Sequence, residues 1–223
     1  MMELTRRQMR ILAFIARYRA ATDELLRRKF VPAHRDIEFI RRTMVRLVQR
    51  GYVREFKIAK GERYYLLTRR GARTTRGIDH TPRELTEQSL PSVLGIGYFC
   101  VAREINRYTA AEFRRKYPDL SPRRLRSSVY YSVETEVGMK IGLFIVDAGG
   151  TQRRVHAKIR RQIAKRMSLP SFVSLIHAGH LRVTILVSTE IRREKLSAFL
   201  AKRSFGDVEV EVAWVPELEQ LEG

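Results

Sequence analysis

Cysteine is almost missing from this chain of 223 residues, in which Cys100 is the single example. One cysteine cannot form a disulfide within the chain, and a reducing cytoplasm suits such a sequence best. Cys100 lies in the apolar segment GIGYFCVA, where a small buried side chain is expected rather than a nucleophile. The sequence therefore predicts a cytoplasmic protein without a disulfide framework.

Long apolar runs are absent as well. No stretch of about 18 apolar residues occurs, so we expect no transmembrane helix and no membrane partner. The first residues, MMELTRRQMRILAFIARYR, contain neither the core nor the cleavage site of a signal peptide. Hydrophobic residues still make up 44% of the chain, enough for a folded core in one large or two small domains.

Negative charge is scarce and unevenly spread. The chain has 44 Lys and Arg against 24 Asp and Glu, a formal net charge of +20. Residues 1–80 hold 21 basic and 8 acidic side chains, a net of +13, whereas residues 81–223 hold 23 and 16, a net of +7. Such a balance predicts a polyanionic partner, nucleic acid before an anionic membrane, bound mainly by the first eighty residues.

The first eighty residues predict three helices. Thr5 is the expected N-cap of the first helix, whose apolar positions Met9, Leu12, Ile15 and Ala16 follow helical spacing. Thr22 begins a second, TDELLRRKF, which Pro32 separates from a third. The third, AHRDIEFIRRTMVRLVQRG, ends at Gly51. Its apolar stripe consists of Ile37, Ile40, Met44 and Leu47.

The next segment, YVREFKIAKGERYYLLTRRG, alternates on both sides of Lys60-Gly61 and predicts a β-hairpin. Three helices followed by a hairpin is the order of a winged helix-turn-helix, whose third helix enters the major groove of DNA. The residues of that helix expected to face DNA are Arg35, Arg42 and Arg46 opposite its apolar stripe, with Gln49 beside them and Arg41 to one flank.

In the hairpin, Lys57, Lys60 and Arg63 surround the turn and are expected to bind phosphates. A merely solvated surface is the alternative reading of these charges. DNA binding is favoured because the basic side coincides with the groove-facing helix of the fold.

Three segments, LTRRQMRILAFIARYRAAT, IRRTMVRLVQRGYV and YYLLTRRGAR, together resemble the replication-relaxation family of plasmid and phage winged-helix proteins. The resemblance covers about residues 4–76. The RGYV turn and the LT..G pattern are also similar to MarR-like repressors. The resemblance implies a double-stranded DNA partner and a mobile-element setting.

The Gly-, Thr- and Arg-rich segment RRGARTTRGIDHTPREL predicts a domain boundary near residues 77–83. We therefore expect a winged helix-turn-helix domain over residues 1–78 and an α/β domain over residues 79–223. In the latter, LTEQSLPSVLGIGYFCVAREI predicts a helix pair or a Pro-interrupted helix, and TAAEFRRKYPDLSP predicts a short helix. Strands and helices then alternate as strand, strand, helix, strand, helix, strand.

This order resembles the core of restriction-endonuclease-like nucleases, which the replication-relaxation family also resembles in its C-terminal part. The resemblance implies a carboxylate cluster for Mg²⁺, but Ser127 and Ser128 occupy the expected Pro-Asp positions and Ile145 that of a second acid. Asp147 remains, and Lys158 lies on the following helix. A lone carboxylate is a poor Mg²⁺ ligand set, so we expect no catalytic residues, no metal and no cofactor.

Two weaker candidates for a metal site stay open. Glu134 and Glu136 share a strand face and offer an alternative carboxylate pair, unless that face is simply exposed to solvent. His177 and His180 have metal-like spacing without neighbouring cysteines or acids, which favours ordinary loop or buried histidines.

The sequence predicts a sequence-specific DNA-binding protein that acts as a transcriptional regulator or as a replication or mobilisation accessory factor. A homodimer on a pseudo-palindromic site is expected, since two recognition helices one turn apart double the contacts. The alternatives are a metal-dependent endonuclease targeted by the winged helix, and an interaction module for RNA or an acidic protein.

Overall fold

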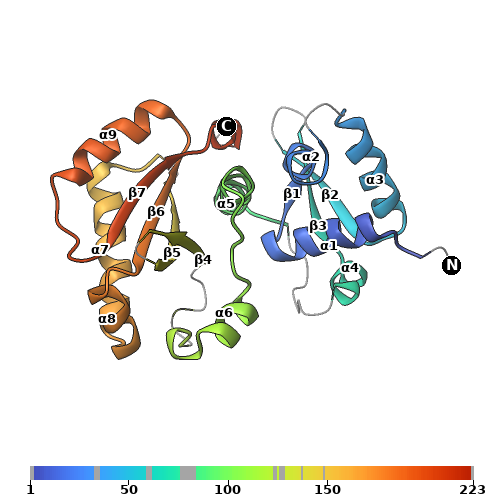
Figure 1. Ribbon diagram of the computed structural model, residues 1–223. Coiled ribbons are helices and arrows are strands. Elements are labelled where there is room, and N and C mark those ends of the chain that lie inside the picture. Colours follow the sequence, from blue (N-terminus) through green and yellow to red (C-terminus); the bar gives the residue numbers. More distant parts are fainter. Residues whose placement is uncertain are drawn as a thin grey trace. The chain divides into compact units, whose positions relative to one another are not determined.

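The computed structural model of this mixed α and β chain contains two compact units, Met1–Val101 and Ala102–Glu222 (Figure 1). The structure describes residues 3–32, 36–58, 62–75, 84–122, 125, 129–136, 138–147 and 149–221. The boundary predicted at 77–83 lies outside these residues, and the division between the units comes later in the chain. No helix within the described ranges has the length and apolar character needed to cross a membrane.

The first two helices of the first unit begin where the sequence predicts. Helix α1 (Arg6–Tyr18) starts with a capping box, in which Thr5 and Gln8 each accept a hydrogen bond from the backbone N–H of the other. Helix α2 (Asp23–Phe30) is capped by Thr22, whose hydroxyl accepts a hydrogen bond from the N–H of Leu25.

The predicted hairpin is present and is joined by a third strand. Strand β2 (Val53–Lys57) pairs antiparallel with β3 (Arg63–Leu67). The predicted turn between the two strands, at Lys60-Gly61, lies outside the described residues. Strand β1 (Ala21–Thr22) adds to the other edge of β3, giving the order β1-β3-β2. Two residues are too short a run to show alternation, which is why the sequence did not predict β1.

Helix α3 (Glu38–Gln49) starts later than its sequence pattern predicts. The N–H of Glu38 donates to the carboxylate of Asp36. Ile37, which was expected in the buried stripe, instead precedes the helix as a half-buried cap residue. Ile40, Met44 and Leu47 are fully buried, as predicted. Gly51 follows the helix with a φ of +70°, a conformation that favours glycine, and its N–H donates to Val48.

Helix α4 (Arg69–Thr74) occupies part of the segment predicted to be a linker. Thr68 caps it, and the backbone of Gly71 lies so close to the residue before β2 that an added Cβ would stand 2.1 Å from the carbonyl oxygen of Tyr52. Gly71 therefore serves a close contact and Thr68 a helix cap, rather than a flexible connection.

Helix α5 (Leu90–Ala102) is a single helix, and Pro91 stands in its first turn, where no helical N–H is needed. The prediction of a Pro-interrupted helix was wrong for this reason. All its faces are apolar and most residues are buried. Tyr98 shares a 2.5 Å hydrogen bond with Thr22, and a Cβ on Gly97 would meet Leu25 at 2.9 Å, so α5 belongs to the first unit.

The second unit begins with α6 (Ala110–Lys116) and the short 3₁₀ helix η2 (Pro118–Leu120). Its sheet has the order β4-β5-β6-β7, with β4 (Tyr130–Thr135) antiparallel to β5 (Gly138–Val146). Strands β6 (Leu181–Val187) and β7 (Glu209–Trp214) continue parallel to β5. The predicted alternation of strands and helices along the chain is confirmed, whereas the sequence did not predict the order of the strands within the sheet.

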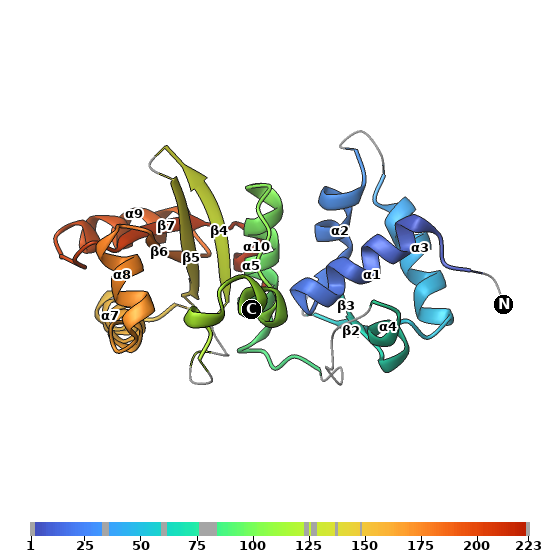
Figure 2. The ribbon, with the colours of Figure 1, turned by 60° about the horizontal axis from the view of Figure 1, so that its bottom comes forward.

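Three helices connect the parallel strands and pack on one face of the sheet, as Figure 2 shows. They are α7 (Gln152–Met167), α8 (Pro170–His177) and α9 (Glu190–Ala201). The short helix α10 (Glu217–Leu221) closes the described chain. On the sheet face turned away from α7 to α9, Gly142 leaves room for the ring of Tyr131, which an added Cβ would approach to 2.0 Å.

Candidate nucleic-acid interface

The exposed side of α3 is determined by its buried stripe. Because Ile40, Met44 and Leu47 are fully buried, the residues on the opposite side of the helix must point outward. These outward residues are Arg42, Val45, Arg46 and Gln49, all exposed. The structure thus brings three of the predicted DNA-facing residues onto one free helical surface, and Arg35 lies outside the described residues.

Arg42 and Arg46 make no ion pair within the part of the chain that the structure describes. Their charges are therefore available to an outside anion. A guanidinium can form two parallel hydrogen bonds to a phosphate or to the O6 and N7 atoms of guanine. This surface has the chemistry needed for both backbone contacts and base contacts.

Arg41 differs from its neighbours on α3. One of its guanidinium nitrogens lies 2.6 Å from the carboxylate of Glu38, and another lies 3.7 Å from that of Asp23. The hydrogen bond to Glu38 raises the pKa of Arg41. Burial raises the pKa of Asp23, while a hydrogen bond from Tyr65 and the charges of Arg63 and Arg41 oppose that change. Arg41 thus links α3 to α2, and the carboxylates of Glu38 and Asp23 offset much of its positive charge.

The hairpin contributes fewer free charges than the sequence predicts. Lys57 is exposed at the end of β2, and the guanidinium of the exposed Arg54 lies over the ring of Phe56 at 5.0 Å. Arg63 lies 3.4 Å from Glu55 across the strand pair, which partly neutralises it. Lys60 lies outside the described residues. Of the three predicted phosphate ligands, Lys57 is therefore the clearest.

One basic residue beside α3 was missed by sequence reasoning. The guanidinium of Arg7, from the first turn of α1, lies 4.4 Å from the centroid of the Phe39 ring on α3. Both residues are exposed. This contact joins residues 32 positions apart, so helical spacing along either helix does not reveal it. Arg7 extends the basic surface of α3 toward the start of α1.

Asp147 occupies the carboxyl end of β5, where open α/β sheets often bind ligands. Its buried carboxylate finds its partners within the protein. One oxygen lies 2.6 Å from the guanidinium of Arg192 in the first turn of α9, and the other accepts a hydrogen bond from the N–H of Gly150 at 3.1 Å. Arg192 also donates to the carbonyl of Gly150. The acid is therefore satisfied without an added cation.

Lys158 does not reach the Asp147 carboxylate as a catalytic lysine would. Its ammonium donates to the carbonyl of Val146 at 3.2 Å. Burial lowers the pKa of Lys158, and the charge of Asp147 opposes that change. The described residues include no group of three or more His, Cys, Asp or Glu arranged to hold a metal ion. Ser127 and Ser128 lie outside those residues.

The remaining metal candidates are separated from each other. Glu134 is exposed on β4 and Glu136 is exposed in the turn that follows it. His177 is exposed at the end of α8, and its Nδ1 atom lies 3.3 Å from the carboxylate of Asp207, whereas His180 precedes β6. Neither pair joins a larger group of ligands in the described chain.

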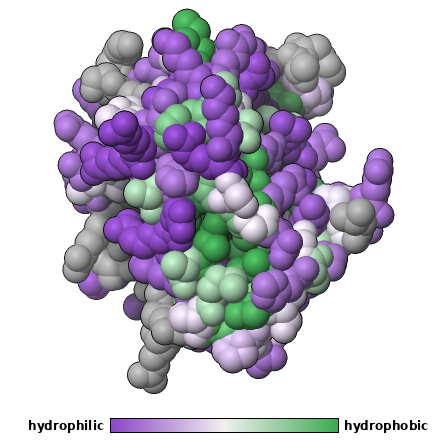
Figure 3. Space-filling view, turned by 90° about the vertical axis from the view of Figure 1, so that its left-hand side faces the viewer, coloured by the Kyte–Doolittle hydropathy of each residue, from purple (hydrophilic) through white to green (hydrophobic). Residues whose placement is uncertain are grey.

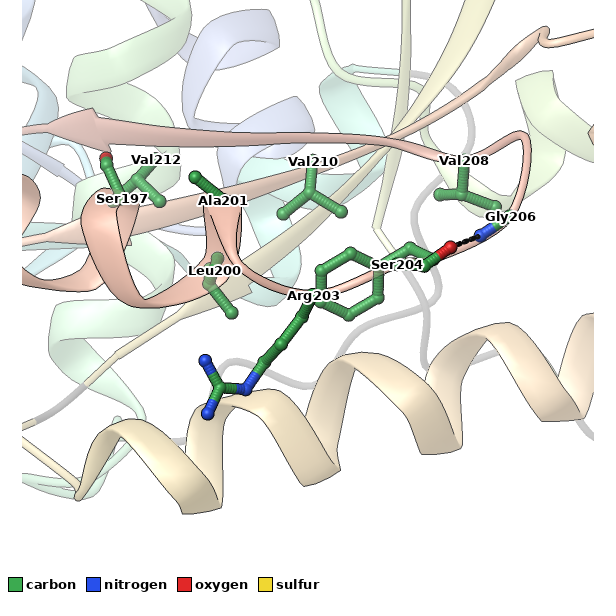
Figure 4. A pocket seen from close by; sticks show the side chains of 10 residues that line it. Ser197, Leu200, Ala201, Arg203, Ser204, Gly206, Val208, Val210 and Val212 are labelled. Atoms are coloured by element: carbon green, nitrogen blue, oxygen red, sulfur yellow. Dashed lines mark hydrogen bonds between the residues drawn. The ribbon is translucent and has the colours of Figure 1, made fainter.

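A groove of about 460 Å³ lies beside β7 in the second unit (Figure 4). Its floor is apolar, with Leu200 of α9 and the side chains of Val208, Val210 and Val212. Arg203 supplies a charge at its rim, but its guanidinium lies over the ring of Phe199 at 3.4 Å. Figure 3 shows apolar residues gathered in a strip on one face of this unit. The groove carries no catalytic arrangement of polar groups.

Neither a family model, nor a curated protein, nor a solved structure matches this chain.

Proposed function

We propose that the first unit is a winged helix-turn-helix and that the protein binds double-stranded DNA sequence-specifically through α3. The observation that carries the proposal is the free surface of Arg42, Arg46 and Gln49 opposite the buried stripe of α3. The order α1, β1, α2, α3, β2, β3 supports it, since a helix-turn-helix followed by a hairpin is the arrangement that docks its third helix in a major groove.

The proposed role is that of a transcriptional regulator, or of a replication or mobilisation accessory factor of a plasmid or phage. A homodimer on a pseudo-palindromic site fits this role, because two symmetric copies present two recognition helices to two half-sites. The net charge of +20 supports a polyanionic partner in general.

For the second unit we propose a scaffold without cleavage chemistry, in place of the nuclease that its resemblance to restriction-endonuclease-like proteins suggests. Asp147 is bound by Arg192 and Gly150 rather than by further acids that would complete a Mg²⁺ site. Both crossovers of the parallel strands pack on the same face, so the sheet lacks the switch point at which α/β proteins form a ligand crevice.

The binding proposal is tested with the full chain and a random duplex library, by selection followed by fluorescence anisotropy on the enriched sequence. We expect enrichment of one motif, and a log affinity that falls linearly with log salt by about 0.9 per phosphate contacted. Preference for an RNA hairpin over every duplex would contradict the proposal and would favour the interaction-module alternative.

The absence of cleavage is tested by incubating the protein with supercoiled plasmid and Mg²⁺ or Mn²⁺. We expect no nicking above the buffer control. Metal-dependent nicking that disappears in Asp147→Ala would overturn this part of the proposal and leave the binding part intact.

A further inference from the structure

Val45 is an unexpected residue on the exposed side of α3. It is a β-branched apolar side chain with 46% of its surface exposed, and it lies between Arg42 and Arg46 in the sequence. Phe39, the other large exposed apolar residue of this helix, is covered by the Arg7 guanidinium. Packing within the first unit therefore explains Phe39 but gives no reason for a valine at position 45.

The position of Val45 relative to its polar neighbours is specific. On a helix that turns about 100° per residue, Arg42 and Gln49 lie opposite the buried stripe, while Val45 and Arg46 flank them on either side. A polyanion reached by Arg42, Gln49 and Arg46 is therefore also within reach of Val45. A valine in a helix has one strongly preferred χ1 rotamer, so its two methyl groups are held in place before any partner arrives.

The surroundings of Val45 decide what kind of group it can contact. A protein-docking surface needs several apolar side chains together, whereas the helical neighbours of Val45 are Arg41, Arg42 and Gln49, with the half-buried Val48 as the one apolar side chain beside it. The major groove offers an isolated apolar group of matching size, the 5-methyl of thymine, among hydrogen-bonding base edges. Arginine pairs with guanine and glutamine with adenine in the same groove.

We infer that Val45 is a specificity-determining residue whose methyl groups contact the 5-methyl of a thymine in each half-site, next to base pairs bound by Arg42 and Arg46. This inference rests on the proposed function and extends it from DNA binding to the composition of the bound sequence.

The experiment uses the full chain and the duplex enriched from the random library. Each thymine is replaced in turn by deoxyuridine, which removes the 5-methyl group and leaves the hydrogen-bonding edge unchanged. For the wild-type protein we expect a three- to fourfold loss of affinity, about the value of one buried methyl group, at one thymine of each half-site. Replacement of the remaining thymines should change the affinity by less than this.

Two variants separate the methyl contact from general binding. Val45→Ser removes both methyl groups, so its affinity should be the same for thymine and deoxyuridine at that position. Arg46→Ala is the matched control: it should bind more weakly overall yet keep the thymine preference. Val45→Ile, which retains the branched side chain, should keep the preference as well. Since Val45 is half exposed, these variants are expected to fold, which circular dichroism checks.

The outcomes are distinguishable. If no duplex is enriched, the proposed function fails and the inference fails with it. If a duplex is bound but no deoxyuridine lowers the affinity of the wild type, or if the loss persists in Val45→Ser, the inference is overturned while DNA binding stands.

Discussion

Asp147 and Arg192 form a nearly buried ion pair that joins the end of β5 to the first turn of α9. A carboxylate oxygen lies 2.6 Å from one guanidinium nitrogen and 2.8 Å from another, and the Asp147 side chain is only 3% exposed. The pair joins two residues 45 positions apart in the sequence. It neutralises the acid that the sequence places where a nuclease would be expected to hold a metal ligand.

Breaking this pair should destabilise the second unit. In Arg192→Met the Asp147 carboxylate is left buried without its cation, and we expect a loss of about 3 kcal/mol in the free energy of unfolding. Asp147→Asn combined with Arg192→Met should lose less, because no buried charge remains. The fluorescence of Trp214, the one tryptophan of the chain, reports urea unfolding of this unit. A double variant as unstable as Arg192→Met would contradict this account.

The arginines of α3 should differ in their effect on DNA binding. Arg42→Ala and Arg46→Ala should each weaken binding to the selected site by about 1–3 kcal/mol. Arg41→Ala should weaken it less, because Glu38 and Asp23 already hold its charge. Gel-shift titrations measure the three, with Arg160→Ala, an exposed arginine of α7, as the matched control. Equal losses for Arg41→Ala and Arg42→Ala would count against the proposed docking of α3.

Lys57 at the end of β2 should act on affinity without affecting sequence preference. As an exposed ammonium suited to a phosphate, its loss in Lys57→Ala should weaken binding to all duplexes alike. It should also reduce the slope of log affinity against log salt by about 1. Anisotropy titrations with selected and scrambled duplexes at several salt concentrations measure both quantities. A change confined to the selected duplex would identify Lys57 as a base-reading residue instead.

Arg166 on α7 is fully buried, and its guanidinium donates to the hydroxyl of Tyr130 at 2.6 Å and to the carbonyl of Gln162 at 2.7 Å. Burial lowers the pKa of Arg166, and contact with Tyr130 opposes that change. Arg166→Ala should lower the free energy of unfolding by about 3 kcal/mol, since it leaves a cavity and removes the hydrogen-bond donor to the Tyr130 hydroxyl. Arg166→Met with Tyr130→Phe should cost less, because the volume is filled and the hydroxyl is gone. Urea unfolding of these variants tests this.

Glu209 should make the second unit sensitive to acid. Its partial burial opposes ionisation, but hydrogen bonds from Lys140 at 2.8 Å and from Arg182 outweigh it and lower the pKa of Glu209. A carboxylate whose pKa is lowered in the folded state stabilises the protein at pH values above the ordinary glutamate pKa of about 4.3. This contribution disappears as the pH falls through the lowered pKa.

Glu209→Gln should therefore be less stable than the wild type at pH 7 and should lose less stability between pH 5 and pH 3. Melting temperatures followed by Trp214 fluorescence across this range compare the two proteins. Parallel curves for wild type and variant would show that Glu209 does not contribute to the acid response.

Local signals in the sequence predicted most elements of the fold. Thr5 and Thr22 each accept a hydrogen bond from an N–H in the first turn of the helix that follows, so a few neighbouring residues are enough to predict these starts. The stripe of α3 and the alternation of β2 and β3 are likewise repeats within one element. Where the pattern was too short, as in β1, or matched the composition of a linker, as in α4, the prediction failed.

The sequence by itself determined most of the helices and strands, the end of α3 just before Gly51, and the side of α3 that carries Arg42, Arg46 and Gln49. These follow from chain geometry and from the need to bury apolar side chains. The tertiary structure alone decided that Arg192 pairs with Asp147, that Glu38 and Asp23 hold Arg41, and that α5 packs with α2. These partners are close in space but far apart in the sequence. A local repeat in the sequence therefore cannot predict them.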